Sequence, residues 1–380
     1  MNSSNALPAK LVSVAFGLGF IGLAASVIGA ISDPTHVLQS YLLAFVYWTG
    51  LSIGALGLLL LQYVTGGEWG RVIRRTVEAA SLNLPVMALL FIPILACISR
   101  IYVWAVIPSA HYNADYLNVP FFIVRSCIYF AIWSALALRL RHWSLLRENG
   151  SYAGKGPETL SGVGLVLFVL TVTFASIDWI MSLEPEWSST IFGVLIMVGQ
   201  GLAAMSICIV VLHSASAEES LTDDVRHDLG NLSFMFIMFW GYMALSQYLI
   251  IWSGNLPEEI PWYLHRREGG WPWVASALLF FHFALPFFLL LFRSVKRNKQ
   301  RLYYVAYLIL AAHFVDSYWL IMPNFRPDGP MPCWQDVAAM LGIGGVWIAL
   351  AARRLNCAPL FAKKLPVAEH GEAKPVAGSQ

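Results

Sequence analysis

Several ionisable side chains stand inside long apolar stretches of this sequence, where a charge is costly. They are Arg100, Arg125, Asp178, His313 and Asp316. A helical rise of about 1.5 Å per residue places the two arginines and the two aspartates at a similar depth. His313 precedes Asp316 by three residues, so their side chains share one helix face. The pattern supports either a paired ionic cluster that fixes helix packing or a proton path or polar ligand pocket opening toward the outside.

His282 stands in a different position from these residues. It lies about 16 Å into its apolar stretch and so near the middle of a membrane. A lone histidine at that depth is either a hydrogen-bonded packing residue or part of a polar chain. Gln200 and Gln247 would extend such a chain around it.

Three further polar residues, Glu78, His213 and Asp228, stand at the other edge of the apolar stretches. Their simplest role is that of helix caps and interfacial charges. In a functional reading they form an inner part of the path, which receives or delivers protons at the cytoplasmic edge.

The sequence argues against a redox cofactor on this chain. Its five cysteines are scattered with no CxxC and no CxxCH, whereas iron–sulfur clusters and covalent haem need closely spaced thiolates. A bis-histidine haem needs two imidazoles at matched depth, and His213, His282 and His313 are expected at three depths. We therefore expect no haem, cluster or metal here and assign no catalytic residue.

The composition indicates the environment that must hold these residues. The 380 residues are 58% hydrophobic and only 12% charged, against about 25% charged residues in soluble domains. Mean hydropathy is +0.64. This balance excludes a soluble protein and a nucleic-acid binder, and it leaves lipid as the expected surroundings.

A bilayer core needs about 20 apolar residues per helix, and the chain contains about ten such runs. The class expected is therefore an all-α polytopic membrane protein. The first run resembles a signal peptide but is long enough to be a retained helix. The runs cover residues 11–31, 40–65, 82–105, 119–138, 160–181, 190–213, 230–253, 271–292, 302–322 and 335–352.

Lysines and arginines between these runs predict the orientation. Nineteen of the 24 fall in segments on one side, three (Arg266, Arg267 and Arg326) fall on the other, and two lie within runs. By the positive-inside rule both termini are expected in the cytoplasm.

Spacing within the chain also predicts an internal repeat. Asp178 stands seven residues before Pro185, and Asp316 stands seven residues before Pro323. Four spans separate the copies, so the repeat would be parallel. The predicted organisation is an N-terminal segment with the first helix (1–39), a first four-helix bundle (40–185), a second four-helix bundle (186–325), a tenth helix (326–354) and a disordered cytoplasmic tail (355–380).

Four sequence runs resemble the polysulfide-reductase/NrfD-like membrane subunits of bacterial alternative complex III, most closely the second such subunit. The resemblance extends from the first to the tenth expected helix. The longest run is the most specific. The runs are SIDWIMSLEPEWSSTIFG (176–193), DLGNLSFMFIMFWGYMALSQYLIIWSGNLPEEIPWYLHRREGGW (228–271), FHFALPFFLLLFRSVKRN (281–298) and HFVDSYWLIMPNF (313–325).

The resemblance implies two four-helix bundles flanked by one helix at each end. It implies a bacterial inner-membrane complex that oxidises quinol and reduces cytochrome c or another acceptor. The implied partners are an iron–sulfur/molybdopterin-like subunit, multihaem and monohaem cytochrome c subunits, a sister NrfD-like membrane subunit and lipids. Haem and iron–sulfur clusters would belong to those partners, and a quinone is left open as a ligand of this chain.

The resemblance also implies a proton path on this subunit. Its positions are Asp178 in IDWIMSLEP, His282 in FHFALP, and His313 with Asp316 in HFVD. Arg125 joins them by depth alone, outside any motif.

Two alternatives remain at this point. One is a structural subunit that only anchors the outer redox proteins. The other is a solute transporter, suggested by the repeat, by a midplane histidine and by Pro93 and Pro286, which interrupt two helices.

Overall fold

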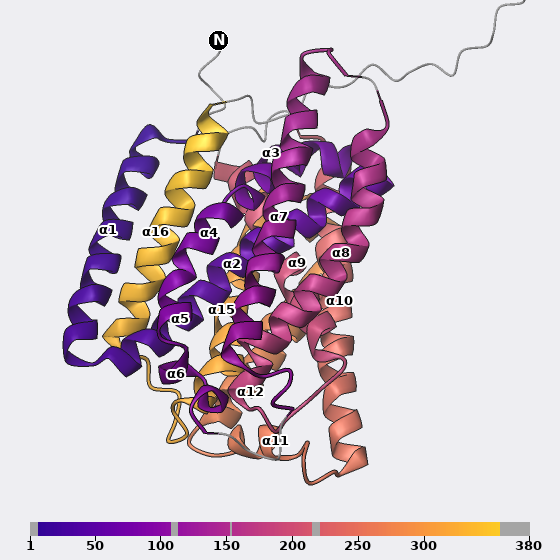
Figure 1. Ribbon diagram of the computed structural model, residues 1–380. Helices are drawn as coiled ribbons and strands as arrows, with labels where there is room; N and C mark the ends of the chain where they lie inside the picture. The colour runs from indigo at the N-terminus through magenta and orange to yellow at the C-terminus, as the bar shows by residue number, and fades with distance from the viewer. Residues whose placement is uncertain (1–6, 108–112, 153, 215–220, 358–380) are drawn as a thin grey trace, which may run out of the picture.

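The computed structural model describes residues 7–107, 113–152, 154–214 and 221–357, and within these ranges it contains helices and loops but no strand (Figure 1). Ten spans in this part of the chain are long and apolar enough to cross a membrane. The prediction of an all-α polytopic membrane protein is confirmed. Most of the expected tail (355–380) and the first six residues lie outside the described residues.

The ten spans follow one another along the chain and four of them consist of more than one helical piece. They are α1 (Ala9–Ser32); α2 (Pro34–Thr65); α3 (Glu68–Ser81) with α4 (Leu84–Leu90) and α5 (Ile92–Ala96); α7 (Val119–Glu148); α8 (Gly156–Trp179) with η3 (Met181–Leu183); α9 (Phe192–Ser214); α10 (Asp223–Gly254); α12 (Trp271–Leu278) with η5 (Leu279–Ala284) and α13 (Leu285–Leu291); α15 (Lys299–Ile321) with η6 (Met322–Asn324); and α16 (Trp334–Asn356). The connecting segments add α6 (Ile98–Ile101), η2 (Val103–Ala105), α11 (Pro261–His265) and α14 (Arg293–Arg297).

The third span begins earlier than the sequence indicated. The apolar run predicts a start near residue 82, whereas the structure starts the span at Glu68 with α3. Arg75 and Glu78 of α3 are buried because they pair with each other and with neighbouring charges. Further along, Pro85 and Pro93 stand at the beginnings of α4 and α5, because a proline without an N–H interrupts the preceding helical turn.

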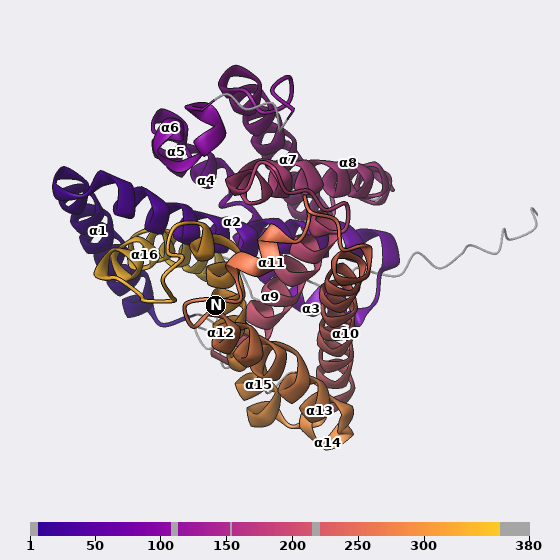
Figure 2. The same cartoon turned by 90° about the horizontal axis from the view of Figure 1, so that it is seen from below.

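The spans pack in two groups that meet at the centre. In the first group α2 contacts α3, α4 and α8, and α7 packs on α4 and α8. In the second group α9 contacts α10 and α15, and the α12–η5–α13 span packs on α10 and α15. The most extensive packing between the groups is that of α2 on α9, which lie together in the middle of Figure 2.

The first and last helices pair with each other at the edge of the first group. α1 lies along α16 in both ribbon views, and α16 also contacts α2 and α3 (Figures 1 and 2). Small residues make the close approach possible. A Cβ built on Gly22 would lie 2.4 Å from the backbone nitrogen of Gly342, and one on Gly345 would lie 2.3 Å from the backbone nitrogen of Gly19.

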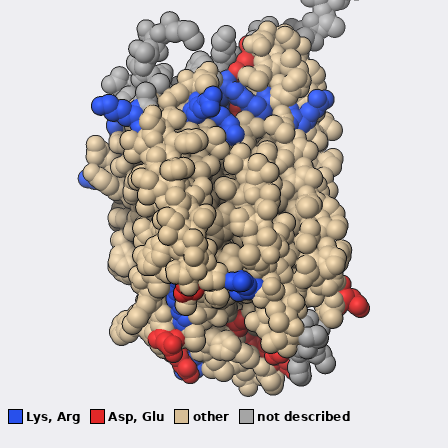
Figure 3. Space-filling view, turned by 60° about the vertical axis from the view of Figure 1, so that its left-hand side comes forward, with Lys and Arg blue, Asp and Glu red and all other residues tan. Residues whose placement is uncertain are grey.

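Positive side chains gather at one end of the helices, called here the basic end (Figure 3). α1 begins and α16 ends at this end (Figure 1). The opposite end carries most of the acidic groups visible in Figure 3 and two buried arginines, Arg266 and Arg326. The described Lys and Arg residues at the helix ends on this side are Lys10, Arg71, Arg74, Arg75, Arg139, Arg141, Arg147, Lys155, Arg226, Arg293, Lys296, Arg297, Lys299, Arg301, Arg353 and Arg354.

Candidate functional site

The first polar site lies between α7 and α8 and consists of a fully paired carboxylate. Arg125 donates from Nε and Nη2 to the two oxygens of Asp178, at 2.9 and 2.8 Å. Tyr129 donates its hydroxyl to Asp178 Oδ2 at 2.7 Å. Asp178 is fully buried, and a bidentate arginine with a third donor satisfies a carboxylate at such a site. This arrangement fits the interpretation of a packing ion pair.

The rest of the Arg125 guanidinium is also accounted for. Its Nη1 donates to the carbonyl of Tyr116 at 3.0 Å, and its Cζ lies 3.9 Å from the Tyr116 ring centre and 4.1 Å from that of Phe121. Burial raises the pKa of Tyr116, and the nearby Asp178 carboxylate raises it further, so this ring stays a neutral phenol. Arg125 is thus held by one anion, one carbonyl and two aromatic faces.

A second polar site lies in the other helix group, around α15. His313 Nδ1 is 4.0 Å from Asp316 Oδ2, too far for a hydrogen bond. The His282 ring lies 6.1 Å from the His313 ring, centre to centre, and Trp240 packs edge-on against His282 at 4.3 Å. The structure therefore brings together His282, His313 and Asp316 from two spans, as a proton path requires. We call these three residues with Gln200 and Trp240 the α15 cluster.

The rings of His282 and His313 are neighbours in the structure. The sequence places His282 at the midplane and His313 in the outer half, and the two rings lie 6.1 Å apart, centre to centre. His282 lies in the π-helical segment η5. Pro286 has no N–H to donate to the carbonyl of His282, four residues earlier, and a wider turn accommodates this loss.

Polar atoms of the α15 cluster are buried without partners. Among the described residues, no hydrogen bond reaches either ring nitrogen of His282, Nδ1 of His313, Nε1 of Trp240 or Oε1 of Gln200. A buried polar group without a partner costs about 1–3 kcal/mol. Such an arrangement persists where the unpaired groups serve a function or hold a water molecule.

A small cavity beside the α15 cluster has the size of one water molecule. It measures about 20 Å³ and is lined by Gln200, His313, Asp316 and Ser317 together with apolar residues. A second cavity of about 10 Å³ shares Gln200 and extends to Ser176 near the first site. A buried water needs about 10–15 Å³ and two to four polar partners. The first cavity meets both requirements.

The structure separates the residues that the sequence grouped by depth. Among the described residues, Asp178 is the carboxylate that pairs with Arg125, and Asp316 has no arginine partner. Arg100 is exposed and does not contribute to the expected charge cluster. Gln247 accepts from Ser189 at 3.4 Å and belongs to a different contact from Gln200.

The three residues expected at the inner edge have three different settings. Glu78 is buried and accepts from Arg141 at 2.5 Å and from Arg75 at 3.3 Å. The His213 ring stacks on Tyr303 at 4.1 Å between centres. Asp228 is exposed. Only Glu78 has the burial of a site residue.

Sequence reasoning missed two members of these sites. Tyr129 follows Arg125 by four residues, so helical spacing places both on one face and was a usable signal. Trp240 had no comparable signal, because it reaches His282 from another span.

The arginines at the opposite end serve as loop anchors. Arg266 pairs with Glu184 at 2.9 Å and lies 3.8 Å from the Trp262 ring centre, and burial lowers its pKa while Glu184 opposes this shift. Arg326 makes two bonds to Asp336, at 2.7 and 2.9 Å, and Ser40 donates to the same carboxylate at 2.6 Å.

The part of the chain that the structure describes contains no group of three or more His, Cys, Asp or Glu side chains arranged to hold a metal ion. No protein-family model matches this sequence, and no curated protein matches it. The function must therefore be argued from the α15 cluster and the sequence runs themselves.

The buried imidazole of His282, which has no hydrogen-bond partner among the described residues, leads to a prediction about stability. Replacing His282 by leucine is expected to raise the free energy of unfolding by about 1 kcal/mol, because two buried nitrogens without partners are removed. Denaturant unfolding of the purified protein in mixed micelles measures this change. A clear loss of stability instead would mean that a bound water or a partner group satisfies the imidazole.

Proposed function

We propose that this chain is a membrane subunit of a quinol:cytochrome c (or other acceptor) oxidoreductase and conducts protons through the α15 cluster. The first part rests on the four sequence runs that resemble the NrfD-like membrane subunits of alternative complex III, most closely the ActF-type second subunit. In this proposal the chain supports quinol oxidation but does not catalyse it alone.

Proton conduction is proposed because buried polar atoms of the α15 cluster have no hydrogen-bond partner among the described residues. Asp316 and His313 stand 4.0 Å apart beside a cavity of about 20 Å³. A carboxyl group and an imidazole at this separation exchange protons through one water molecule. Asp178 differs, because its carboxylate already has three donors. We therefore assign the path to Asp316, His313 and His282 and give Arg125 and Asp178 a structural role.

The direction of transport follows from the charges. We place the basic end in the cytoplasm of a bacterial inner membrane by the positive-inside rule, which puts both termini there. Asp316 stands near the end of α15 that is remote from the basic end. Protons leaving it would be released outward, on the side where quinol oxidation releases its own protons.

The proposed partners supply the redox groups. An iron–sulfur/molybdopterin-like subunit and the multihaem and monohaem cytochromes would hold the clusters and haems, and a sister NrfD-like subunit would hold the principal quinol site. A quinone headgroup does not fit the cavities of about 20 and 10 Å³ beside the α15 cluster. We therefore route no step through a quinone on this chain.

The complex is tested by native purification of the tagged chain in mild detergent. We expect haem absorption bands from co-purifying cytochromes, and mass spectrometry should identify an iron–sulfur partner. A colourless protein that arrives alone would overturn the proposal and favour a transporter, which liposome uptake of a labelled solute by the pure chain would then examine.

The proton path is tested by replacing Asp316 with asparagine in the purified complex. Electron transfer from quinol to cytochrome should continue, because no redox group is touched. The protons released per electron in proteoliposomes should fall to the ratio that quinol oxidation alone supplies. The matched control is Asp224→Asn, which removes a carboxylate that is 83% exposed in a surface ion pair.

An unchanged proton ratio in Asp316→Asn would instead support the anchor function. The saturated Arg125–Asp178 pair favours that alternative for the first helix group. An anchor would also tolerate neutral replacements of both His313 and Asp316 without loss of quinol oxidation.

A further inference from the structure

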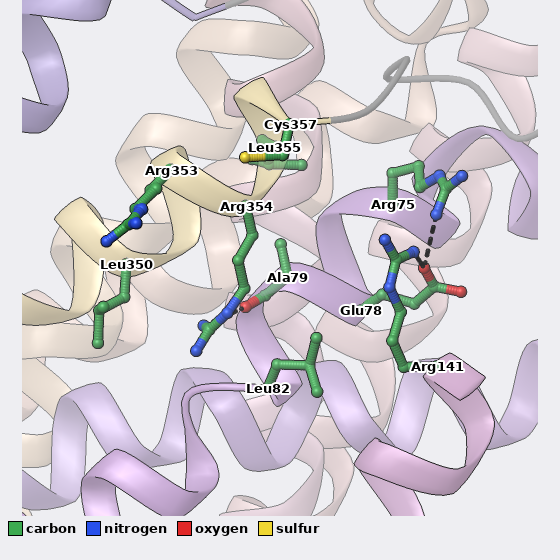
Figure 4. Close-up of a pocket in the computed structure, with 10 residues that line it drawn as sticks. All are labelled: Arg75, Glu78, Ala79, Leu82, Arg141, Leu350, Arg353, Arg354, Leu355 and Cys357. Atoms are coloured by element: carbon green, nitrogen blue, oxygen red, sulfur yellow. Dashed lines mark hydrogen bonds and ion pairs between the residues drawn. The ribbon is translucent and has the colours of Figure 1, made fainter. Parts of the chain in front are cut away.

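A cavity lies at the basic end, between α3, α7 and α16. Its volume is about 320 Å³. Figure 4 shows Glu78 between Arg75 and Arg141 on one wall, and Arg354 reaching from α16 toward α3 on the other. Arg353 also lines the cavity. Neither the α15 cluster nor the proposed proton path uses this pocket.

The charges of the pocket do not balance. On one wall, two arginines are paired with two carboxylates. Arg75 pairs with Glu78 and Glu148, and Arg141 pairs with Glu78. Among the described residues, no carboxylate pairs with Arg353 or Arg354. Four arginines thus face two carboxylates, and a half-buried positive charge without a counter-ion favours binding of an anion.

Arg354 is held in place by neutral acceptors only. Its Nη1 donates to the carbonyl of Ala79 at 3.2 Å and to the side-chain oxygen of Asn83. These contacts fix the guanidinium over α3 but leave its charge uncompensated. Its remaining N–H groups are available to a phosphate, which arginine binds with good geometry.

Unpaired atoms on the opposite wall indicate a ligand with both acceptors and donors. Arg75 Nε and Glu78 Oε1 are buried and make no hydrogen bond to the described residues. Their residues are only 6% and 2% exposed. A headgroup hydroxyl would accept from Arg75 and donate to Glu78. A phosphoglycerol headgroup offers both.

We propose that this pocket binds the headgroup of an acidic glycerophospholipid, with its phosphate between Arg353 and Arg354 and a headgroup hydroxyl at Glu78. Half-buried Leu82 and Leu350 line the same pocket and would contact the acyl chains. Basic pockets between helices at the cytoplasmic side of membrane proteins bind anionic headgroups in this way. The leucines favour a lipid over free phosphate, which has no apolar part.

Lipid titration of the purified full-length protein, with its co-purifying subunits, tests the proposal. Native mass spectrometry counts bound phosphatidylglycerol, and phosphatidylcholine and inorganic phosphate are the comparison ligands. We expect retention of phosphatidylglycerol in preference to both. Replacing Arg353 and Arg354 together by glutamine should weaken its binding about tenfold or more.

Two further variants separate recognition from folding. Arg353→Gln alone changes an exposed residue with no partner among the described residues and should weaken binding without changing unfolding. The matched control is Arg293→Gln with Arg301→Gln, which removes the same charge from exposed positions at the basic end but outside the pocket. The proposal would be overturned if the control variant lost as much phosphatidylglycerol binding as the pocket variants, or if neither pocket variant changed that binding. Retention of inorganic phosphate equal to that of phosphatidylglycerol would also overturn it.

Discussion

Replacing Asp178 by alanine is expected to lower the free energy of unfolding by about 3–5 kcal/mol. The carboxylate accepts from Arg125 twice and from Tyr129 once. Its removal leaves a buried guanidinium without a counter-ion and a buried hydroxyl without an acceptor, which is the costly way to break an ion pair. Denaturant unfolding in mixed micelles measures the loss.

Removing all three partners distinguishes pairing from a proton-carrying role. Asp178→Ala combined with Arg125→Met and Tyr129→Phe should recover most of the lost stability, because no buried polar group then stands unpaired. Asp224→Ala, at an exposed ion pair, should change stability by no more than about 0.5 kcal/mol. If Asp178→Ala keeps native stability and lowers the proton ratio, Asp178 belongs to the path and its structural assignment is wrong.

Replacing Gly22 by leucine is expected to separate α1 from α16 at a cost of about 3 kcal/mol or more. A Cβ at Gly22 would lie 2.4 Å from the nitrogen of Gly342 and 2.5 Å from the carbonyl oxygen of Ala338. Both atoms are backbone, so no rotamer change relieves the overlap. Thermal unfolding and the distance between spectroscopic probes on the two helices both report the change.

The same helix offers a matched control for this prediction. A Cβ at Gly17 has no atom within 4 Å, so Gly17→Leu should leave the distance between α1 and α16 unchanged. The two variants add the same side chain to the same helix. Equal effects of both would show that leucine disturbs α1 itself and not its packing on α16.

The polytopic fold was predictable because hydropathy is a local property. Each run of apolar residues must cross or avoid the bilayer whatever its neighbours do. The one large error in the spans, at α3, has the same origin. Arg75 and Glu78 appear as loop charges in the sequence and become buried only because α7 brings Arg141 and Glu148 to them.

The candidate site was predictable in its residue types but not in its pairs. Helical spacing correctly placed His313 and Asp316 together, since three residues span one turn. Depth alone grouped Asp178 and Asp316 as equals. The structure distinguishes them. α7 packs on α8, so that Arg125 of α7 pairs with Asp178, whereas no arginine among the described residues pairs with Asp316.

The sequence by itself determined an all-α membrane protein of ten spans and the buried polar residues within them, because both follow from local composition. Only the tertiary structure decided which polar residues are saturated and which remain unpaired, and it alone assembled the arginine pocket from three separate helices. The physical reason is that hydrogen bonds and ion pairs are satisfied across helices. Helix rotation, the π-helical turn at His282 and the neighbour on each side fix those contacts, and a single helix does not specify them.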